Sequence, residues 1–382
     1  MARNAPIDLL RGVAIGLVLL LHFSLTYRLS KSPLADWLGV GAVRALVNNG
    51  NYGVTMFFVV SGYLITSNTL RRFGTIGAID VRAFYVMRAA RILPLLLLAV
   101  LIIVVLGLLG VPSFGNTDGG KNLPVSFYFV AVASVLTFTH NLLMQSVGYF
   151  NYCLNIYWSL SVEEVFYLAF PLLCVLARRR ALVVAMCLCA IAVGPLYRHL
   201  HADDELYFMY GYAACFDAIA FGCLAALVAS VKRPAPQAAR WLGVAAALAL
   251  ATSYLAGIGG HEAFGFTAMA ASAAVLVWCA SASSGAGWAD ARWLAPLRWA
   301  GRHSYELYLF HIIVLAAMRG LVPRAQMGAD WKLPSLLLFI AASAGVAGLV
   351  ARYFSEPINA ALRRRFDTAR APTRGARPVP TA

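Results

Sequence analysis

Residues 7–23 have the sequence IDLLRGVAIGLVLLLHF, an apolar run that is interrupted by Asp8, Arg11 and His22. A run of about 20 apolar residues is long enough to cross a bilayer as an α-helix. Ionisable side chains inside such a helix are costly, and they usually line a cavity or a transport path. From Arg11 to His22 the helix makes three turns and rises about 16 Å, so both side chains lie on one face. This stretch predicts a membrane helix with one polar group near the surface and another deep in the bilayer.

The whole chain has the composition of a polytopic membrane protein. Hydrophobic residues make up 61% of its 382 residues and charged residues only 12%, whereas soluble domains contain about 25% charged residues. The net charge of +15 therefore indicates topology and contact with membrane lipid, and we expect no nucleic-acid partner. The seven cysteines have neither disulfide nor zinc spacing, and no metal-ligand motif is present, so we expect no metal.

The apolar segments decide the topology, and they occupy residues 8–27, 52–70, 92–110, 127–143, 157–177, 181–197, 206–231, 241–257, 263–281, 304–318 and 334–354. If the more polar segment 127–143 does not cross, ten spans remain, and most of the 31 lysines and arginines fall on the side of both termini. Cytoplasmic loops are enriched in these residues. The sequence therefore predicts an all-α bundle of about ten spans with both termini cytoplasmic, and with 127–143 re-entrant or interfacial. We expect one transmembrane domain over residues 1–360 and a basic, disordered cytoplasmic tail over residues 361–382.

Two adjacent acids, Glu163 and Glu164, lie in the segment 157–177, which enters from the side opposite the N-terminus. If this span begins at residue 157, Glu163 lies about 9 Å below the surface, which matches the depth expected for His22. A histidine beside a carboxylate is the arrangement that a general base needs. We therefore predict that His22 and Glu163 form a catalytic pair. The alternative is a buried pair that only ties two helices together.

Three arginines are predicted to meet at the cytoplasmic surface. Arg88 and Arg91 are spaced so that they share a helix face, and Arg11 enters the bilayer nearby. The planar guanidinium group suits a phosphate, so one hypothesis is a phosphate clamp. The other is that these arginines only follow the enrichment of positive charge on the cytoplasmic side or contact anionic lipid.

The remaining polar positions in the apolar segments are candidates to line a substrate path. Ser61 and Gly62 follow an apolar run, and they indicate either close helix packing or a polar lining. Tyr308 and His311 lie on one polar stripe with Ser304, and the histidine either bonds a neighbouring helix or takes part in catalysis. The full set of predicted lining residues is Asp8, Ser61, Trp158, Glu164, Tyr308 and His311.

Taken together, these motifs resemble the transmembrane acyltransferase family 3, which includes bacterial O-antigen and exopolysaccharide acetylases. The motifs that match the family are Ile7-Asp8-Leu-Leu-Arg11-Gly12 with His22, Gly53 to Gly62, Arg88-x-x-Arg91-Ile-x-Pro94, Trp158-Ser-Leu-x-x-Glu163-x-x-Phe-Tyr167, Ser304 with Tyr308 and His311, and Glu356-Pro357. The resemblance implies ten spans, acyl-CoA as the cytoplasmic donor and a carbohydrate hydroxyl as the acceptor. It also implies that Arg11, Arg88 and Arg91 hold the donor, while His22 and Glu163 are catalytic.

We therefore predict a bacterial inner-membrane O-acyltransferase that uses acetyl-CoA and acts on a cell-surface or lipid-linked carbohydrate such as lipopolysaccharide. Direct transfer and a route through an acyl-histidine are both open. A small-molecule acceptor, such as a macrolide or a lipid, is an alternative. A proton-coupled transporter of lipid-linked sugars is the alternative from another class, although the sequence lacks the internal repeat that transporters often show. The sequence does not indicate an oligomeric state.

Overall fold

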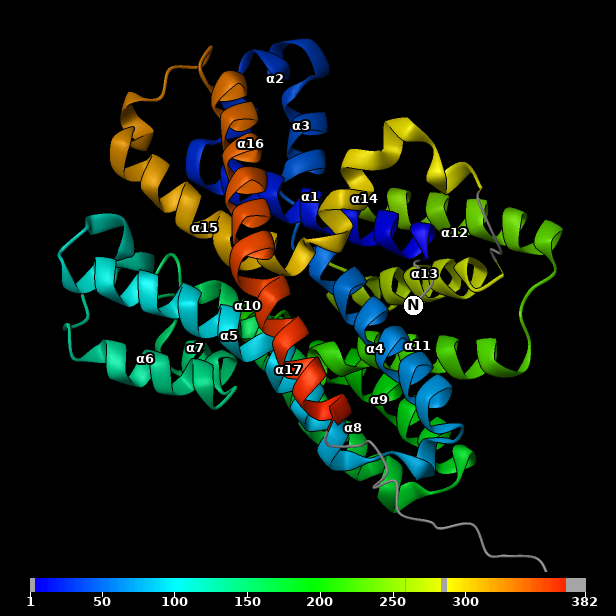
Figure 1. Ribbon diagram of the computed structural model, residues 1–382. Coiled ribbons are helices and arrows are strands. Elements are labelled where there is room, and N and C mark those ends of the chain that lie inside the picture. The colour runs from blue at the N-terminus through cyan, green and yellow to red at the C-terminus, as the bar shows by residue number, and fades with distance from the viewer. Residues whose placement is uncertain (1–3, 258, 283–286, 369–382) are drawn as a thin grey trace, which may run out of the picture.

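The protein is a bundle of helices. The computed structural model describes residues 4–257, 259–282 and 287–368, and these ranges contain no strand (Figure 1). The α-helices are α1 (Ala5–Tyr27), α2 (Pro33–Leu38), α3 (Val40–Val47), α4 (Tyr52–Phe73), α5 (Val81–Leu108), α6 (Phe127–Leu136), α7 (His140–Val147), α8 (Trp158–Ala177), α9 (Arg180–Leu200), α10 (Glu205–Phe208), α11 (Tyr212–Val231), α12 (Pro236–Ala256), α13 (Glu262–Ala280), α14 (Ala295–Arg302), α15 (Ser304–Leu321), α16 (Lys332–Val350) and α17 (Glu356–Thr368). The predicted all-α class is confirmed.

Within the described ranges, ten helical segments are long and apolar enough to cross a membrane. They are Ala5–Tyr27, Val40–Phe73, Val81–Leu108, Asn155–Ala177, Arg180–Leu200, Glu205–Val231, Pro236–Ala256, Glu262–Ala280, Ser304–Leu321 and Lys332–Leu362. The predicted number of spans is therefore confirmed, and the cytoplasmic placement of the termini stays a prediction.

The ambiguous segment 127–143 is divided between the short helices α6 and α7. At 1.5 Å per residue neither helix reaches across a bilayer core of about 30 Å. Both lie at the left of Figure 1, away from the N-terminus. The predicted tail begins inside α17, which continues to Thr368, and residues 369–382 lie outside the described residues.

Helix α1 is fixed at both ends by its own sequence. The Asn4 side chain caps it by accepting a hydrogen bond from the backbone N–H of Ile7 at 3.2 Å, and it also donates to the carbonyl of Ala280 at 3.0 Å. At the other end Arg28 adopts a left-handed conformation, and its N–H bonds the carbonyl of Ser24. The helix therefore holds its polar face in a defined orientation in the middle of the bundle (Figure 1).

Glycines allow α4 and α11 to touch backbone to backbone. A Cβ atom on Gly62 would lie 2.1 Å from the carbonyl oxygen of Ile219, and one on Gly222 would lie 2.0 Å from that of Val59. Such close approach is typical of small-residue helix crossings in membranes. Of the two interpretations of the Ser61–Gly62 pair, the glycine therefore fits close packing, while the adjacent Ser61 faces a cavity.

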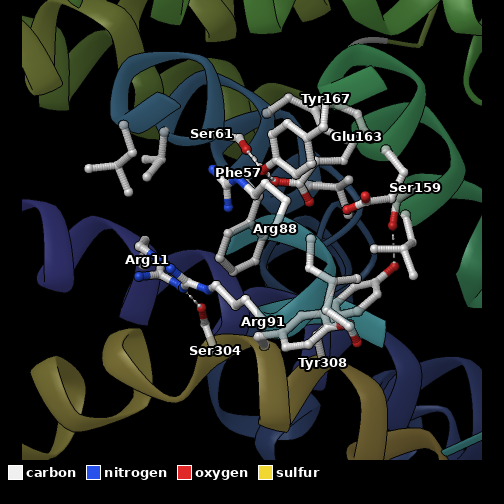
Figure 2. A pocket seen from close by; sticks show the side chains of 18 of the residues that line it. Arg11, Phe57, Ser61, Arg88, Arg91, Ser159, Glu163, Tyr167, Ser304 and Tyr308 are labelled. Atoms are coloured by element: carbon white, nitrogen blue, oxygen red, sulfur yellow. Dashed lines mark hydrogen bonds between the residues drawn. The ribbon is translucent and has the colours of Figure 1, made fainter. Parts of the chain in front are cut away.

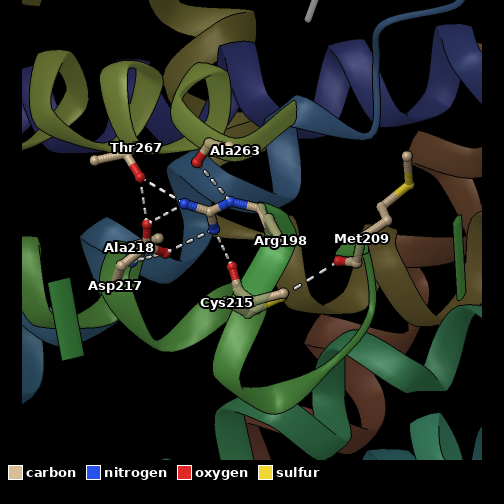
Figure 3. Close-up of polar contacts among 8 residues, drawn as sticks. Arg198, Met209, Cys215, Asp217, Ala218, Ala263 and Thr267 are labelled. Atoms are coloured by element: carbon tan, nitrogen blue, oxygen red, sulfur yellow. Dashed lines mark hydrogen bonds and ion pairs between the residues drawn. The ribbon is translucent and has the colours of Figure 1, made fainter. Parts of the chain in front are cut away.

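A buried ion pair joins helices α9, α11 and α13 (Figure 3). The guanidinium group of Arg198 bonds Asp217 at 2.6 Å and Thr267 at 2.5 Å, and both charged side chains are almost fully buried. It also donates to the backbone carbonyls of Ala263 and Ala214. All three nitrogens of the guanidinium group thus have acceptors, as a buried charge requires.

Candidate active site

Three arginines converge on a cavity of about 130 Å³ between α1, α4, α5, α8 and α15, which we call the arginine cavity. Arg11 donates to the hydroxyl of Ser304 at 2.8 Å. Arg91 lies beside Arg11, and Arg88 lies nearer α8 (Figure 2). Arg91 is an exposed residue and the other two are half-buried, and all three line the cavity. The predicted meeting of these arginines is observed.

The carboxylate of Glu163 lies across the same cavity and is held by two hydroxyl groups. It accepts hydrogen bonds from Ser61 and from Tyr167. The Arg88 guanidinium carbon lies 4.2 Å from the centre of the Tyr167 ring, a cation–π contact. Among the described residues no salt bridge of 4.0 Å or less is recorded between Glu163 and Arg11, Arg88 or Arg91. The arginine charges are therefore not neutralised by direct contact with Glu163.

A second cavity, of about 630 Å³, begins where the arginine cavity ends, and we call it the histidine cavity. It is lined by His22 near the end of α1 and by polar residues from the loops beyond the helices. Among these are Asp118, whose carboxylate accepts from Asn155 at 2.8 Å, and Glu205, which accepts from Tyr149 at 3.2 Å. Burial raises the pKa of the Tyr149 hydroxyl, so it remains a neutral hydrogen-bonding group.

Aromatic rings form one wall of the histidine cavity. The ring centres of Trp158 and Tyr210 are 4.5 Å apart, and the Tyr210 hydroxyl bonds that of Tyr149 at 2.8 Å. Arg319 and Arg324 also line this cavity, and Arg319 lies over the ring of Tyr152. A wall with flat apolar rings and a few fixed polar groups is typical of a site for a small polar ligand.

Tyr308 of α15 stands between the two cavities and lines both of them. Its hydroxyl bonds that of Ser159 at 2.6 Å and donates to the carbonyl of Ile156 at 2.8 Å (Figure 2). These bonds hold the ring against the start of α8. Tyr308 and Val54 of α4 are the residues that both described linings share.

His22 is paired with His311 of α15. The Nδ1 of His311 is 3.0 Å from the carbonyl oxygen of Leu307, and its Nε2 is 3.1 Å from the Nδ1 of His22. Because a carbonyl only accepts, the proton of His311 lies on Nδ1, and its Nε2 accepts from His22. The Nδ1 of His22, which is also 3.0 Å from the carbonyl of Val18, is thus the donor. The other ring nitrogen of His22, Nε2, therefore carries no proton and has a free lone pair. The His22 side chain lines the histidine cavity.

The structure brings most of the predicted residues to the two cavities. Ser61 and Glu164 line the arginine cavity with Glu163, and Trp158 lines the histidine cavity. The predicted contact between His22 and Glu163 is not formed, because His311 occupies the position of the partner.

Two predicted lining residues have other positions. His311 is fully buried and contacts His22 instead of either cavity. Asp8 lies where α1 crosses α14, with its carbonyl against Gly301, and it is not among the described lining residues.

The sequence interpretation missed the acids of the histidine cavity. Asp118 and Glu205 lie outside the apolar helical runs, in a loop and at the start of the short helix α10. Acidic residues in such segments are ordinary surface residues, so no pattern singled them out. Ser159 and Tyr167 belong to the motif that runs from Trp158 to Tyr167, but their hydrogen-bond partners can be identified only from the fold.

The fold and site define a multi-pass membrane protein in which a cavity lined by three arginines shares lining residues with a cavity lined by a histidine. Residues 4–351 match the family model described as an acyltransferase domain. The chain belongs to this family, the acyltransferase family 3, as its motifs indicated.

Two relatives illustrate the similarity. The chain is 31% identical over 294 residues to the putative peptidoglycan O-acetyltransferase YrhL of Bacillus subtilis, which covers 70% of this chain and 45% of that protein. It is 25% identical over 354 residues to the peptidoglycan O-acetyltransferase OatA of Listeria monocytogenes, covering 85% of this chain and 55% of that protein. The chain thus spans about half the length of these relatives. No solved structure matches it.

Proposed function

We propose that this protein is an O-acetyltransferase of the bacterial inner membrane that uses acetyl-CoA and acts on a hydroxyl group of a cell-surface or lipid-linked carbohydrate. The observation that carries the proposal is the adjacency of the two cavities, with Tyr308 as their common wall. The donor would enter the arginine cavity from the cytoplasm, and the acceptor would enter the histidine cavity from the other side.

The arginine cavity has the chemistry that the donor requires. Guanidinium groups bind phosphate oxygens in a bidentate manner, and CoA carries three phosphate groups. At about 130 Å³ the cavity is too small for the whole donor, so only the acyl arm would pass inward. Arg11, Arg88 and Arg91, which line the cavity, would then contact the phosphates of the donor.

The histidine cavity has the chemistry that a carbohydrate requires. The rings of Trp158 and Tyr210 offer a face for the apolar side of a sugar ring, while Asp118 and Glu205 accept hydrogen bonds from its hydroxyls. The relatives are named for O-acetylation of peptidoglycan, itself a carbohydrate polymer. This supports a carbohydrate over a macrolide or a lipid as the acceptor.

In the proposed reaction His22 acts as the general base. Its Nε2 takes the proton of the acceptor hydroxyl while the oxygen attacks the thioester carbonyl. The new C–O bond forms as the C–S bond breaks, and the proton passes from His22 to the departing CoA thiolate. His311 keeps the proton of His22 on Nδ1 and so keeps Nε2 basic. Exclusion of water from the bundle protects the thioester from hydrolysis.

The test is acetyl transfer by the purified protein in proteoliposomes, followed as release of CoA thiol. We expect thiol release that depends on added acceptor, and mass spectrometry of surface polysaccharide that shows an acetyl-sized loss after deletion of the gene. Release with a small molecule but never with a carbohydrate would contradict the acceptor class. Absence of any acceptor-dependent release would contradict the enzyme and favour the transporter.

Replacing Arg91 with alanine is expected to weaken donor binding roughly tenfold or more, because a hydrogen bond between charged groups contributes about 1.5–3 kcal/mol. The measurement is the dissociation constant of acetyl-CoA by titration calorimetry. Arg82→Ala is the matched control, since Arg82 lies on the same helix and does not line the cavity. Equal affinities for both variants would remove Arg91 from the donor site.

Replacing Glu205 with glutamine is expected to raise the KM for the carbohydrate roughly tenfold, because it removes a charged acceptor from the histidine cavity. The KM for acetyl-CoA should not change, since Glu205 does not line the arginine cavity. Asp203→Asn removes a neighbouring charge that lines neither cavity and serves as the control. A rise in both KM values, or the same effect from Asp203→Asn, would argue against a direct contact with the acceptor.

A further inference from the structure

A third cavity, of about 1260 Å³, lies between α1, α12 and α13, and we call it the apolar slot. Its walls include Leu10, Val13 and Leu17 of α1 and Ala247 and Leu250 of α12. At about 100° per residue, positions 10, 13 and 17 of α1 fall on one side of the helix. Arg11 and His22 fall on the opposite side. The slot is therefore distinct from the two cavities of the proposed active site.

Tyr254 borders the end of the slot that lies away from the start of α1. The hydroxyl of Tyr254 donates to the carbonyl of Leu46 at 2.7 Å, and Asn49 donates to the carbonyl of Tyr254 at 2.7 Å. These bonds tie the end of α12 to α3. The ring of Tyr254 also packs edge-on against Tyr52, with ring centres 6.2 Å apart.

At the other end, near the start of α12, stands Arg240, the one charged residue among the described residues of the slot lining. Its side chain is exposed, and within the described part of the chain it makes no recorded hydrogen bond or ion pair. Two tryptophans flank it: Trp241 is 65% exposed and Trp288, at the slot itself, is 75% exposed. Exposed tryptophan together with arginine is typical of the headgroup level of a membrane.

The dimensions of the slot match a lipid chain. From Arg240 to Tyr254 the helix α12 rises about 21 Å, most of the way through a bilayer core of about 30 Å. Water does not fill a cavity with apolar walls, and an empty cavity would lose the dispersion contacts of its lining. Hydrocarbon is the material that surrounds this part of the bundle.

We propose that the apolar slot binds one anionic phospholipid from the leaflet at the N-terminal side of the bundle. An acyl chain fills the space between α1 and α12, and the phosphate bonds the guanidinium group of Arg240. The lipid then supports the face of α1 that the protein itself leaves uncovered. This proposal does not depend on the proposed function, because it concerns binding only.

Native mass spectrometry of the full chain tests the proposal. The protein is released from vesicles of phosphatidylcholine that contain phosphatidylglycerol, and the retained lipid is counted. We expect the wild type to retain phosphatidylglycerol and Arg240→Gln to lose affinity for it roughly tenfold. Arg233→Gln, which removes a charge from the loop just before α12 without touching the slot, should retain it.

A second variant tests the slot apart from the charge. Ala247→Phe places a ring among the lining residues and should also release phosphatidylglycerol, while the protein keeps its thermal unfolding midpoint in detergent. Equal retention by wild type and Arg240→Gln would overturn the proposal. So would equal retention of phosphatidylcholine and phosphatidylglycerol by the wild type, or a dimer mass that shows a second copy in place of lipid.

Discussion

Alanine at position 22 is expected to lower acetyl transfer by about two to four orders of magnitude, the usual contribution of a general base. The Nε2 of His22 is the base in the proposed reaction, and His22 is the only histidine among the described residues that line the histidine cavity. Binding of acetyl-CoA should stay unchanged, because Arg11, which is proposed to hold the donor phosphates, lies about 16 Å away along α1. The measurement is CoA thiol release in proteoliposomes at saturating donor and acceptor.

The histidine pair provides a graded comparison. His311→Gln keeps the side chain polar but removes the fixed acceptor of the His22 proton, so the rate should fall by a smaller factor than in His22→Ala. His261→Ala changes an exposed histidine in the loop before α13 and should leave the rate unaltered. If His22→Ala and His311→Gln both transfer acetyl groups at the wild-type rate, the histidine pair takes no part in catalysis.

The bundle was predictable because membrane helices follow from length and hydropathy alone. The run from residue 7 to residue 23 identifies α1 without knowledge of any neighbour, and the lysines and arginines decide the parity of the spans. The division of residues 127–143 between two short helices agrees with the prediction of ten spans. The break between α6 and α7 was not predictable, since it depends on contacts such as the 3.2 Å bond from the N–H of His140 to Ser161.

The arginine cavity was also largely predictable, since Arg88 and Arg91 share a helix face and depth places them near Arg11. The hydrogen-bond partner of His22 was not predictable from the sequence. The depth of a residue in the membrane can be estimated from its position along its helix, and the depths estimated for Glu163 and His22 agree. Which helix faces His22 depends on packing, and α15 brings His311 there. A matching depth restricts the possible partners but does not select one.

Removal of the buried charge of Arg198 is expected to cost about 3–5 kcal/mol of folding free energy, the typical effect of breaking a buried ion pair from one side. In Arg198→Ala the carboxylate of Asp217 keeps only Thr267 and a backbone N–H, and the carbonyl of Ala263 loses its donor. The measurement is the thermal unfolding midpoint of the purified protein in detergent micelles, which should fall clearly below that of the wild type.

The double variant Arg198→Met with Asp217→Leu separates the charge from the packing. Replacing both members of a buried pair with apolar residues of similar size is often neutral, so this variant should recover most of the lost stability. Neither Arg198 nor Asp217 lines the arginine or the histidine cavity, so the folded fraction of each variant should keep wild-type KM values.

If Arg198→Ala unfolds at the wild-type midpoint, the cluster does not hold α9, α11 and α13 together. If the double variant is as unstable as the single one, the bonds to the carbonyls and to Thr267 matter more than the ion pair itself (Figure 3).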